Sequence, residues 1–182
     1  YTAMLISVDH GNKQIKTVHT QPFTYGLIQG DTPGFGTDCL AYQGKYYTLT
    51  DQRIPYRRDK TEDERFFILT LFAIAYEIEA MGRYSDTLMR IQLAVGLPPA
   101  HFGVQAKRFI NYFDGRGAIS FQFRGKPYAV YIENTACFPQ SFSAAVATVK
   151  NLTASPKVLV VDIGGVTADY VRRRNGVADM SA

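Results

Sequence analysis

The residues of this chain that are best suited to chemistry lie in a glycine-rich turn near its C-terminal end. The apolar run Val158–Val161 indicates a buried strand, and the residues after it include Asp162, Gly164, Gly165, Thr167 and Asp169. Glycines at a strand-to-strand turn let backbone N–H groups approach an anion closely, because no Cβ stands in the way. A carboxylate in the same turn suits hydrated Mg²⁺, which prefers oxygen ligands and keeps several waters. The pattern therefore predicts a site for phosphates with Mg²⁺.

A second turn of this kind lies near the N-terminal end. The apolar run Met4–Val8 leads into Asp9, Gly11 and Asn12, and Lys16 completes the pattern D-x-G-x-x-x-x-K. A lone D-x-G occurs by chance in many turns, where the aspartate simply caps its own backbone. The matching turn at Asp162 favours the chemical interpretation, because two such turns in one chain are far more specific than either alone. His10, between these residues, is expected to be a satisfied or exposed turn histidine.

Two β-hairpins must position these turns. We expect them over residues 3–20 and 157–174, with Asp9 and Asp162 at the turns. Further strands are predicted over residues 23–29, 38–42, 45–50, 87–95, 117–123 and 128–133. Among these, 38–42 and 45–50 flank Gln43-Gly44, a plausible hairpin turn.

Three helices are predicted between the two turns. The first runs from Arg65 to about Ala80, is too apolar all round for a surface helix, and ends at Gly82. It follows a capping box in which Thr61 and Glu64 would bond each other's backbone N–H groups. A short helix is expected over residues 105–113. Another is expected from Pro139, as a first-turn proline, through about residue 150.

The composition is that of an ordinary globular protein in water. The chain has 182 residues, of which 46% are hydrophobic and 20% charged, so we expect one large domain or two small ones. No apolar run approaches the roughly 18 to 20 residues of a membrane span, and we expect no membrane association. Cys39 and Cys137 show no metal-ligand spacing. Two reduced cysteines are expected in a cytoplasmic protein.

Basic residues gather at two places, and the net charge is +4. The first cluster contains Arg53, Arg57, Arg58, Lys60 and Arg65, and the second is Arg172–Arg174. Such clusters can bind nucleic acid through its phosphates, but acids such as Asp59 and Asp63 interrupt the first. A solvated face explains both clusters, and we expect no direct contact with nucleic acid.

The two acidic turns together resemble the phosphate motifs of the actin-like ATPases, within the superfamily of actin, Hsp70 and sugar kinases. Residues 138–145, FPQSFSAA, and residues 58–75, RDKTEDERFFILTLFAIA, resemble segments of the plasmid-segregation actins of the ParM type. The resemblance covers nearly the whole chain.

The resemblance implies a role for each polar residue of the turns. Asp9 and Asp162 would hold the Mg²⁺-water cluster at the nucleotide phosphates, and Lys16 would contact the β- or γ-phosphate. The expected backbone or side-chain donors to the phosphates are Gly11, Asn12, Gly164, Gly165 and Thr167. Gln140 stands where actin positions the attacking water, and Asp162 would help to orient that water. Without the resemblance, Gln140 is an ordinary polar residue at a helix start.

The fold implied is α/β: an actin-like (ribonuclease H-like) domain I with a mixed five-stranded sheet flanked by helices. Residues 1–29 and 61–155 would form subdomain Ia, residues 30–60 a small inserted subdomain Ib, and residues 156–182 the first hairpin of domain II. The implied protein binds ATP or GTP with Mg²⁺, polymerises into filaments and hydrolyses the nucleotide to drive DNA or plasmid segregation. Its expected partners are copies of itself and a DNA-binding adaptor protein.

One departure from the family pattern leaves the activity of this chain open. The chain ends soon after Asp169, and no glycine-rich adenosine-binding turn follows, so we expect an N-terminal half with weak nucleotide binding. Whether the chain is itself an enzyme is left undecided. The alternatives are a truncated or degenerate actin-like module that regulates filaments, or a relative of the Hsp70 or sugar-kinase type. Hsp70-type chaperones favour a threonine pair in the first turn, which is absent here.

Overall fold

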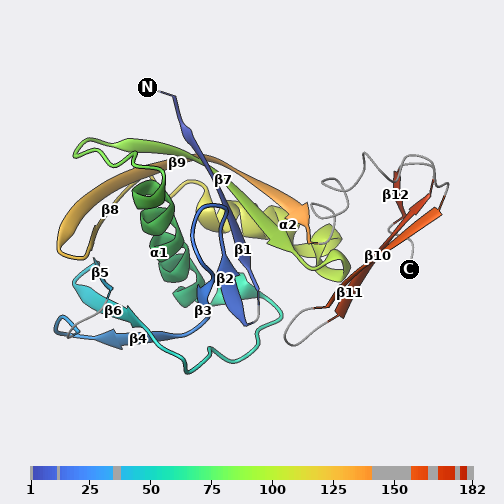
Figure 1. Cartoon of the computed structure of the whole chain (residues 1–182), viewed down its shortest axis with the longest axis horizontal. Helices are drawn as coiled ribbons and strands as arrows, with labels where there is room; N and C mark the ends of the chain where they lie inside the picture. The colour runs from blue at the N-terminus through green and yellow to red at the C-terminus, as the bar shows by residue number, and fades with distance from the viewer. Residues whose placement is uncertain are drawn as a thin grey trace.

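A computed structural model describes residues 2–11, 13–34, 38–140, 157–163, 168–174 and 177–179. These residues form two β-sheets and two α-helices (Figure 1). The mixed α/β class expected from the sequence is confirmed. None of the helices in these ranges is long and apolar enough to cross a membrane.

The larger sheet has nine strands in the order β3-β2-β1-β7-β9-β8-β5-β6-β4. Their bounds are β1 (Met4–His10), β2 (Gln14–Lys16), β3 (Phe23–Thr24), β4 (Leu27–Gly30), β5 (Cys39–Tyr42), β6 (Lys45–Leu49), β7 (Met89–Leu97), β8 (Ala118–Phe123) and β9 (Lys126–Pro139). Strands β1, β7 and β9 run parallel, and the other pairs are antiparallel. The carboxyl ends of β1, β7 and β9 therefore meet at one edge.

The expectation of five strands was too low. Strand β3 extends the sheet beyond β2, and the β5–β6 hairpin joins β8 through Leu40 and Ala41, which pair with Phe123 and Gln122. Strands β4, β5 and β6 thus continue the main sheet. The division of the chain into subdomains at residues 30 and 60 stays a prediction.

Both helices pack on one face of this sheet (Figure 1). They are α1 (Arg65–Ala80) and α2 (Pro99–Phe113), and the short 3-10 helix η1 (Lys60–Glu62) precedes α1. Alternate residues of β1 and β7 are buried against them, as the two-residue period of a strand requires.

Helix α1 lies inside the curve of the sheet. Aromatic pairs tie it to strands and loops on both sides: Tyr25–Phe66, Tyr42–Phe67, Phe23–Tyr76 and Phe72–Phe123, with ring centroids 5.1 to 5.9 Å apart. Its side chains from Phe66 to Ala75 are all buried. The prediction of a central, mostly buried helix is confirmed.

The sequence predicted the C-terminal end of α1 correctly but not its N-terminal end. Gly82 ends the helix as predicted: its φ is +62°, and the N–H groups of Gly82 and Arg83 bond the carbonyls of Glu79 and Ile78, which is a Schellman motif. The predicted capping box is wrong. Thr61 bonds Asp59 instead, because residues 60–62 form a separate turn.

Asp63 caps the start of α1 in place of that box. Its carboxylate accepts from the N–H of Arg65 at 3.0 Å and also pairs with the Arg65 guanidinium. Glu64 instead meets Arg116, with 2.8 Å between the closest oxygen and nitrogen.

Strand β9 and helix α2 are longer than the sequence indicated. Helix α2 begins at Pro99, not at residue 105. Strand β9 continues through Pro139, which pairs with Leu97 of β7, so Pro139 ends a strand and does not open a helix. The helix expected after it, over residues 141–150, lies outside the described residues.

The second sheet has the order β10-β11-β12, with β10 (Lys157–Ile163), β11 (Ala168–Arg174) and β12 (Val177–Asp179). Strands β10 and β11 are antiparallel, and Asp162 is the partner of Asp169. The predicted hairpin over residues 157–174 is confirmed, as is the β1–β2 hairpin, although β2 ends at Lys16.

Candidate functional site

Asp9 lies at the edge where the parallel strands end. Strand β1 pairs with β7 from Met4 to Val8, and beyond this point it turns into β2, where Asp9 is the partner of Lys16. Paired residues on neighbouring strands point to the same side of a sheet, so the carboxylate and the exposed Lys16 share one face. In open α/β sheets, ligands bind outside the carboxyl ends of the strands.

Gln140 reaches Asp9 from the end of β9. Its side-chain amide Nε2 donates to Oδ1 of Asp9 at 2.8 Å, and its backbone N–H donates to the carbonyl of Leu97 at 2.7 Å. The two residues are half-buried. The structure therefore joins two of the predicted site residues from distant parts of the sequence.

Gly96 leaves room for this glutamine. A Cβ at Gly96 would stand 3.0 Å from Cγ of Gln140, closer than side chains ordinarily pack. Gly11 has a similar role in the turn itself, because a Cβ there would stand 2.8 Å from the carbonyl oxygen of Gln14. Both glycines thus lie where another part of the chain approaches closely, a side chain at Gly96 and the backbone at Gly11.

His10 faces the opposite way from Asp9, because successive strand residues alternate. It is fully buried, against Phe109 and Phe113 of α2. Since the Thr70 hydroxyl donates to the carbonyl of Phe66, Nε2 of His10 must donate to Thr70, at 2.6 Å. Burial, with the nearby charge of Lys60, lowers the pKa of His10 to about 3. The expectation of a satisfied turn residue holds in part: Nδ1 finds no partner in the described part of the chain.

Lys60 is the functional candidate that sequence reasoning missed. It was assigned to a solvated cluster, but its side chain is buried and its ammonium donates to the carbonyl oxygen of His10. Burial lowers its pKa to about 8, while the negative charge of Asp9 opposes that shift. No local signal could have found it, because its burial depends on contact between η1 and a turn about 50 residues earlier. Two arginines of the same basic cluster, Arg57 and Arg65, pair with Asp63 instead.

The second acidic turn is described only in part. Strands β10 and β11 bring the backbones of Asp162 and Asp169 together. Four residues predicted for the site lie outside the described residues: Asn12, Gly164, Gly165 and Thr167. The structure thus brings together Asp9, Lys16 and Gln140 of the predicted set, and adds Lys60.

The donors at this edge fit a phosphate–magnesium group. Mg²⁺ is usually held by one or two carboxylates and several waters, and Asp9 supplies one carboxylate. Lys16 and Lys60 supply positive charge for an anion. Within the described ranges, His, Cys, Asp and Glu side chains form no group of three or more that could hold a metal ion without a bound phosphate.

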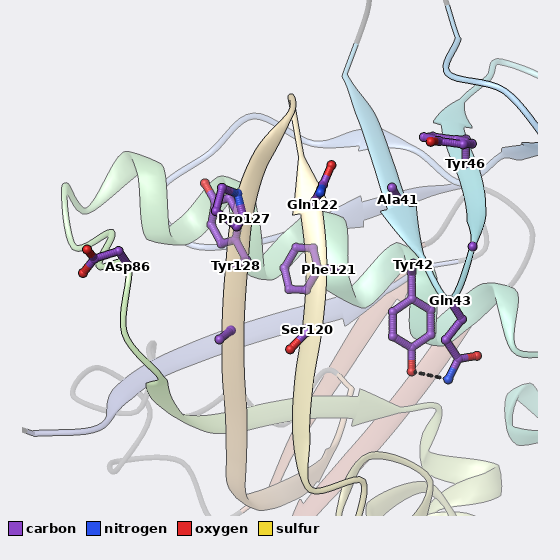
Figure 2. Close-up of a pocket in the computed structure, with 12 residues that line it drawn as sticks. Ala41, Tyr42, Gln43, Tyr46, Asp86, Ser120, Phe121, Gln122, Pro127 and Tyr128 are labelled. Carbon is purple, nitrogen blue, oxygen red and sulfur yellow. Dashed lines mark hydrogen bonds between the residues drawn. The ribbon is translucent and has the colours of Figure 1, made fainter.

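A hollow of about 440 Å³ lies away from this edge, where the β5–β6 hairpin diverges from β8 (Figure 2). It is lined by Tyr42 and Gln43, whose side chains bond each other at 3.2 Å, and by Pro127 and Tyr128. Those last two residues lie at the start of β9, whereas Gln140 follows its end. The hollow is therefore separate from the phosphate turns.

Comparison with known proteins identifies a family and a fold for most of this chain. The family model "Actin like proteins N terminal domain" matches residues 7–142. No curated protein sequence matches the chain.

Solved structures share the fold. The AlfA filament bound to AMPPNP is 16% identical, with a TM-score of 0.72, over 98% of this chain and 67% of its own. The apo psk41 parM protein is 12% identical, with a TM-score of 0.75, over 98% and 64%. Ta0583, an archaeal actin homolog in complex with ADP, is 13% identical, with a TM-score of 0.73, over 95% and 56%. The chain thus spans from just over half to two thirds of the length of these proteins.

Proposed function

This chain belongs to the family of actin-like proteins and carries their N-terminal domain, and on that premise we propose that it forms the phosphate-binding half of a filament-forming ATPase or GTPase. The observation that carries the proposal is the hydrogen bond between Gln140 and Asp9. It places an amide and a carboxylate at the edge where the parallel strands end, which is where nucleotides bind in open α/β sheets.

Asp9 is proposed to hold Mg²⁺ through water, together with Asp162 of the second turn. With one carboxylate on each turn, the two hairpins would bind the same hydrated ion. Lys16, opposite Asp9 on β2, would contact a phosphate as a point charge. The glycines Gly11, Gly164 and Gly165, with Asn12 and Thr167, would donate hydrogen bonds to the phosphate oxygens.

Gln140 is proposed to position the attacking water. Phosphoryl transfer needs little covalent help from the protein, and positioning together with charge neutralisation supplies most of the catalysis. A neutral amide has a donor for Asp9 and a carbonyl oxygen that can accept from a water. The bond to Asp9 fixes the direction of that amide, so its oxygen is held in place before nucleotide arrives.

Assembly into filaments is proposed from the family. AlfA is a filament with AMPPNP bound, and Ta0583 is an actin homolog that binds ADP. Head-to-tail contacts that do not close produce filaments, and residues 30–60 are the proposed place of one such contact. The proposed role is DNA or plasmid segregation, with a DNA-binding adaptor protein as the link to cargo.

Sedimentation tests this proposal. This chain and a version extended to the length of its relatives are spun with Mg²⁺ and AMPPNP, with Mg²⁺ and a non-hydrolysable GTP analogue, and without nucleotide, beside an Asp9→Ala variant of each. We expect the extended version to pellet with one of the nucleotides, and its Asp9→Ala variant not to pellet. Pelleting that depends on neither nucleotide nor Asp9 would indicate a regulatory module instead. A soluble monomer that binds and hydrolyses ATP would indicate a relative of the kinase or chaperone type.

A further inference from the structure

Lys60 lies beneath the first acidic turn, outside both phosphate motifs. The residue is only 7% exposed. The ammonium donates to the carbonyl oxygen of His10 and stands 5.5 Å from the ring centroid of Phe66. It therefore touches the backbone between Asp9 and Gly11 from the side of the helices.

The turn that holds Lys60 is fixed independently of the phosphate turn. Asp59 caps η1 by accepting from the N–H of Thr61 at 2.9 Å, and it pairs with Arg108 of α2. The carbonyl of Asp63 accepts from the Tyr112 hydroxyl at 2.8 Å. Two contacts from α2 thus hold the segment that carries Lys60, and neither of them involves the phosphate turn.

The charge of Lys60 has a chemical consequence for the turn. A buried ammonium is costly unless it is paired, and here the Asp9 carboxylate supplies the opposite charge. The ammonium in turn offsets the repulsion that Asp9 exerts on an approaching phosphate. At low dielectric such an interaction is much stronger than at an exposed site.

We propose that Lys60 is a positioning residue of the phosphate turn: it fixes the backbone between Asp9 and Gly11 through the His10 carbonyl and makes the turn accept a polyphosphate anion. The inference rests on the proposed function and deepens it, because it assigns anion recognition to a residue outside both motifs.

The proposal predicts effects of opposite sign for anions and cations. Lys60→Met removes the charge but keeps a long apolar side chain. It should weaken binding of a polyphosphate anion, and it should leave unchanged or strengthen binding of Mg²⁺ alone at Asp9, because a repelling cation is gone. A merely structural role would weaken both together.

The test is an ¹⁵N NMR titration of this chain, first with inorganic pyrophosphate and separately with Mg²⁺, followed at the amides of His10 and Gly11. We expect Lys60→Met to weaken pyrophosphate binding about tenfold or more, as loss of a hydrogen bond to a charged group does. Mg²⁺ should bind at least as well as before. Lys60→Arg keeps the charge and should retain more pyrophosphate affinity than Lys60→Met. Lys126→Met is the matched control, because Lys126 is exposed at the start of β9, and it should change neither titration.

Four results would overturn the inference, and the last would overturn the proposed function with it. Wild-type pyrophosphate affinity in Lys60→Met would show that the charge is not used. Equal losses for both ions would show a structural role. A folded Lys60→Arg variant that binds pyrophosphate no better than Lys60→Met would also exclude a role for the charge. If Lys60→Met does not fold, pyrophosphate binding by Lys60→Arg at background level has the same meaning. If the wild-type chain binds neither ion at this turn, the proposed nucleotide site fails as well.

Discussion

The side-chain amide of Gln140 donates to the carboxylate of Asp9 at 2.8 Å, although the two residues are 131 positions apart in the sequence. Parallel pairing of β1, β7 and β9 creates this contact, because it brings the carboxyl ends of three strands to one edge.

Gly96→Ala should displace Gln140 without unfolding the protein. The new Cβ would stand 3.0 Å from Cγ of Gln140, and a flexible side chain can move away from it. A displacement of about 1 Å can cost about 100-fold in rate, so we expect phosphate release by the nucleotide-binding protein to slow severalfold or more. The free energy of unfolding should change by less than about 1 kcal/mol. Wild-type phosphate release with Gly96→Ala would argue against a positioned Gln140.

Gly11→Ala should destabilise the first turn, whereas Gly103→Ala should not. At Gly11 a Cβ would meet the carbonyl oxygen of Gln14 at 2.8 Å, so backbone must shift. We expect a loss of about 1–3 kcal/mol, the usual range for a strained substitution. At Gly103, in α2, nothing lies within 4 Å of the new Cβ, and alanine should stabilise the helix by about 1 kcal/mol. Urea denaturation measures both, and equal effects would contradict the turn geometry.

The buried His10 should make folding stability depend on pH. Burial, with the charge of Lys60, lowers its pKa from 6.5 to about 3. Between about pH 6.5 and about pH 3 the imidazole of the unfolded chain binds a proton that the folded protein does not bind. The free energy of unfolding therefore falls as pH falls through this range. From about pH 6.5 to about pH 5 the loss is roughly 2 kcal/mol, at about 1.4 kcal/mol per pH unit.

His10→Phe is the variant that isolates this effect. It keeps an aromatic ring beside Phe109 and Phe113, and Thr70 still has the carbonyl of Phe66 as acceptor. Denaturation in urea at about pH 7 and about pH 5 should show a smaller loss in His10→Phe than in the wild type. The same loss in both proteins would mean that His10 is not the titrating group.

Asp63→Ala should weaken the start of α1 more than Glu64→Ala does. Asp63 accepts from the N–H of Arg65 at 3.0 Å, whereas Glu64 makes no capping bond. Loss of a helix cap costs typically about 1 kcal/mol, and an exposed ion pair such as Glu64–Arg116 contributes less, about 0–1 kcal/mol. Thermal unfolding of both variants decides, and a larger effect of Glu64→Ala would restore the capping box predicted from sequence.

Local patterns in the sequence predicted the elements whose causes are local. The hairpins around Asp9 and Asp162 follow from apolar runs ending in acid and glycine, and Gly82 ends α1 because it adopts a positive φ. Lys60 and Pro139 were misjudged for the opposite reason. The burial of Lys60 arises where η1 meets the β1–β2 turn, and Pro139 is held in a strand by β7. Neither contact leaves a trace in the neighbouring residues.

The sheet shows the same distinction. Strands β5 and β6 were predicted on either side of the turn Gln43-Gly44, whose residues adopt positive φ values of 50° and 75°. Their union with β8, which extends the sheet to nine strands, depends on two residue pairs between distant segments. The side-chain partners of Gln140 could likewise not be predicted, because they depend on register across three strands.

The most direct test measures phosphate release beside light scattering. It uses the protein in a version extended to the length of its relatives, with its Gln140→Ala and Asp162→Ala variants. Gln140→Ala should slow phosphate release about 100-fold, as misplaced reactants do, while filaments still form and persist. Asp162→Ala should remove most hydrolysis through loss of Mg²⁺ and water positioning. If Gln140→Ala releases phosphate at the wild-type rate, its bond to Asp9 is only structural and the proposed hydrolytic site is wrong.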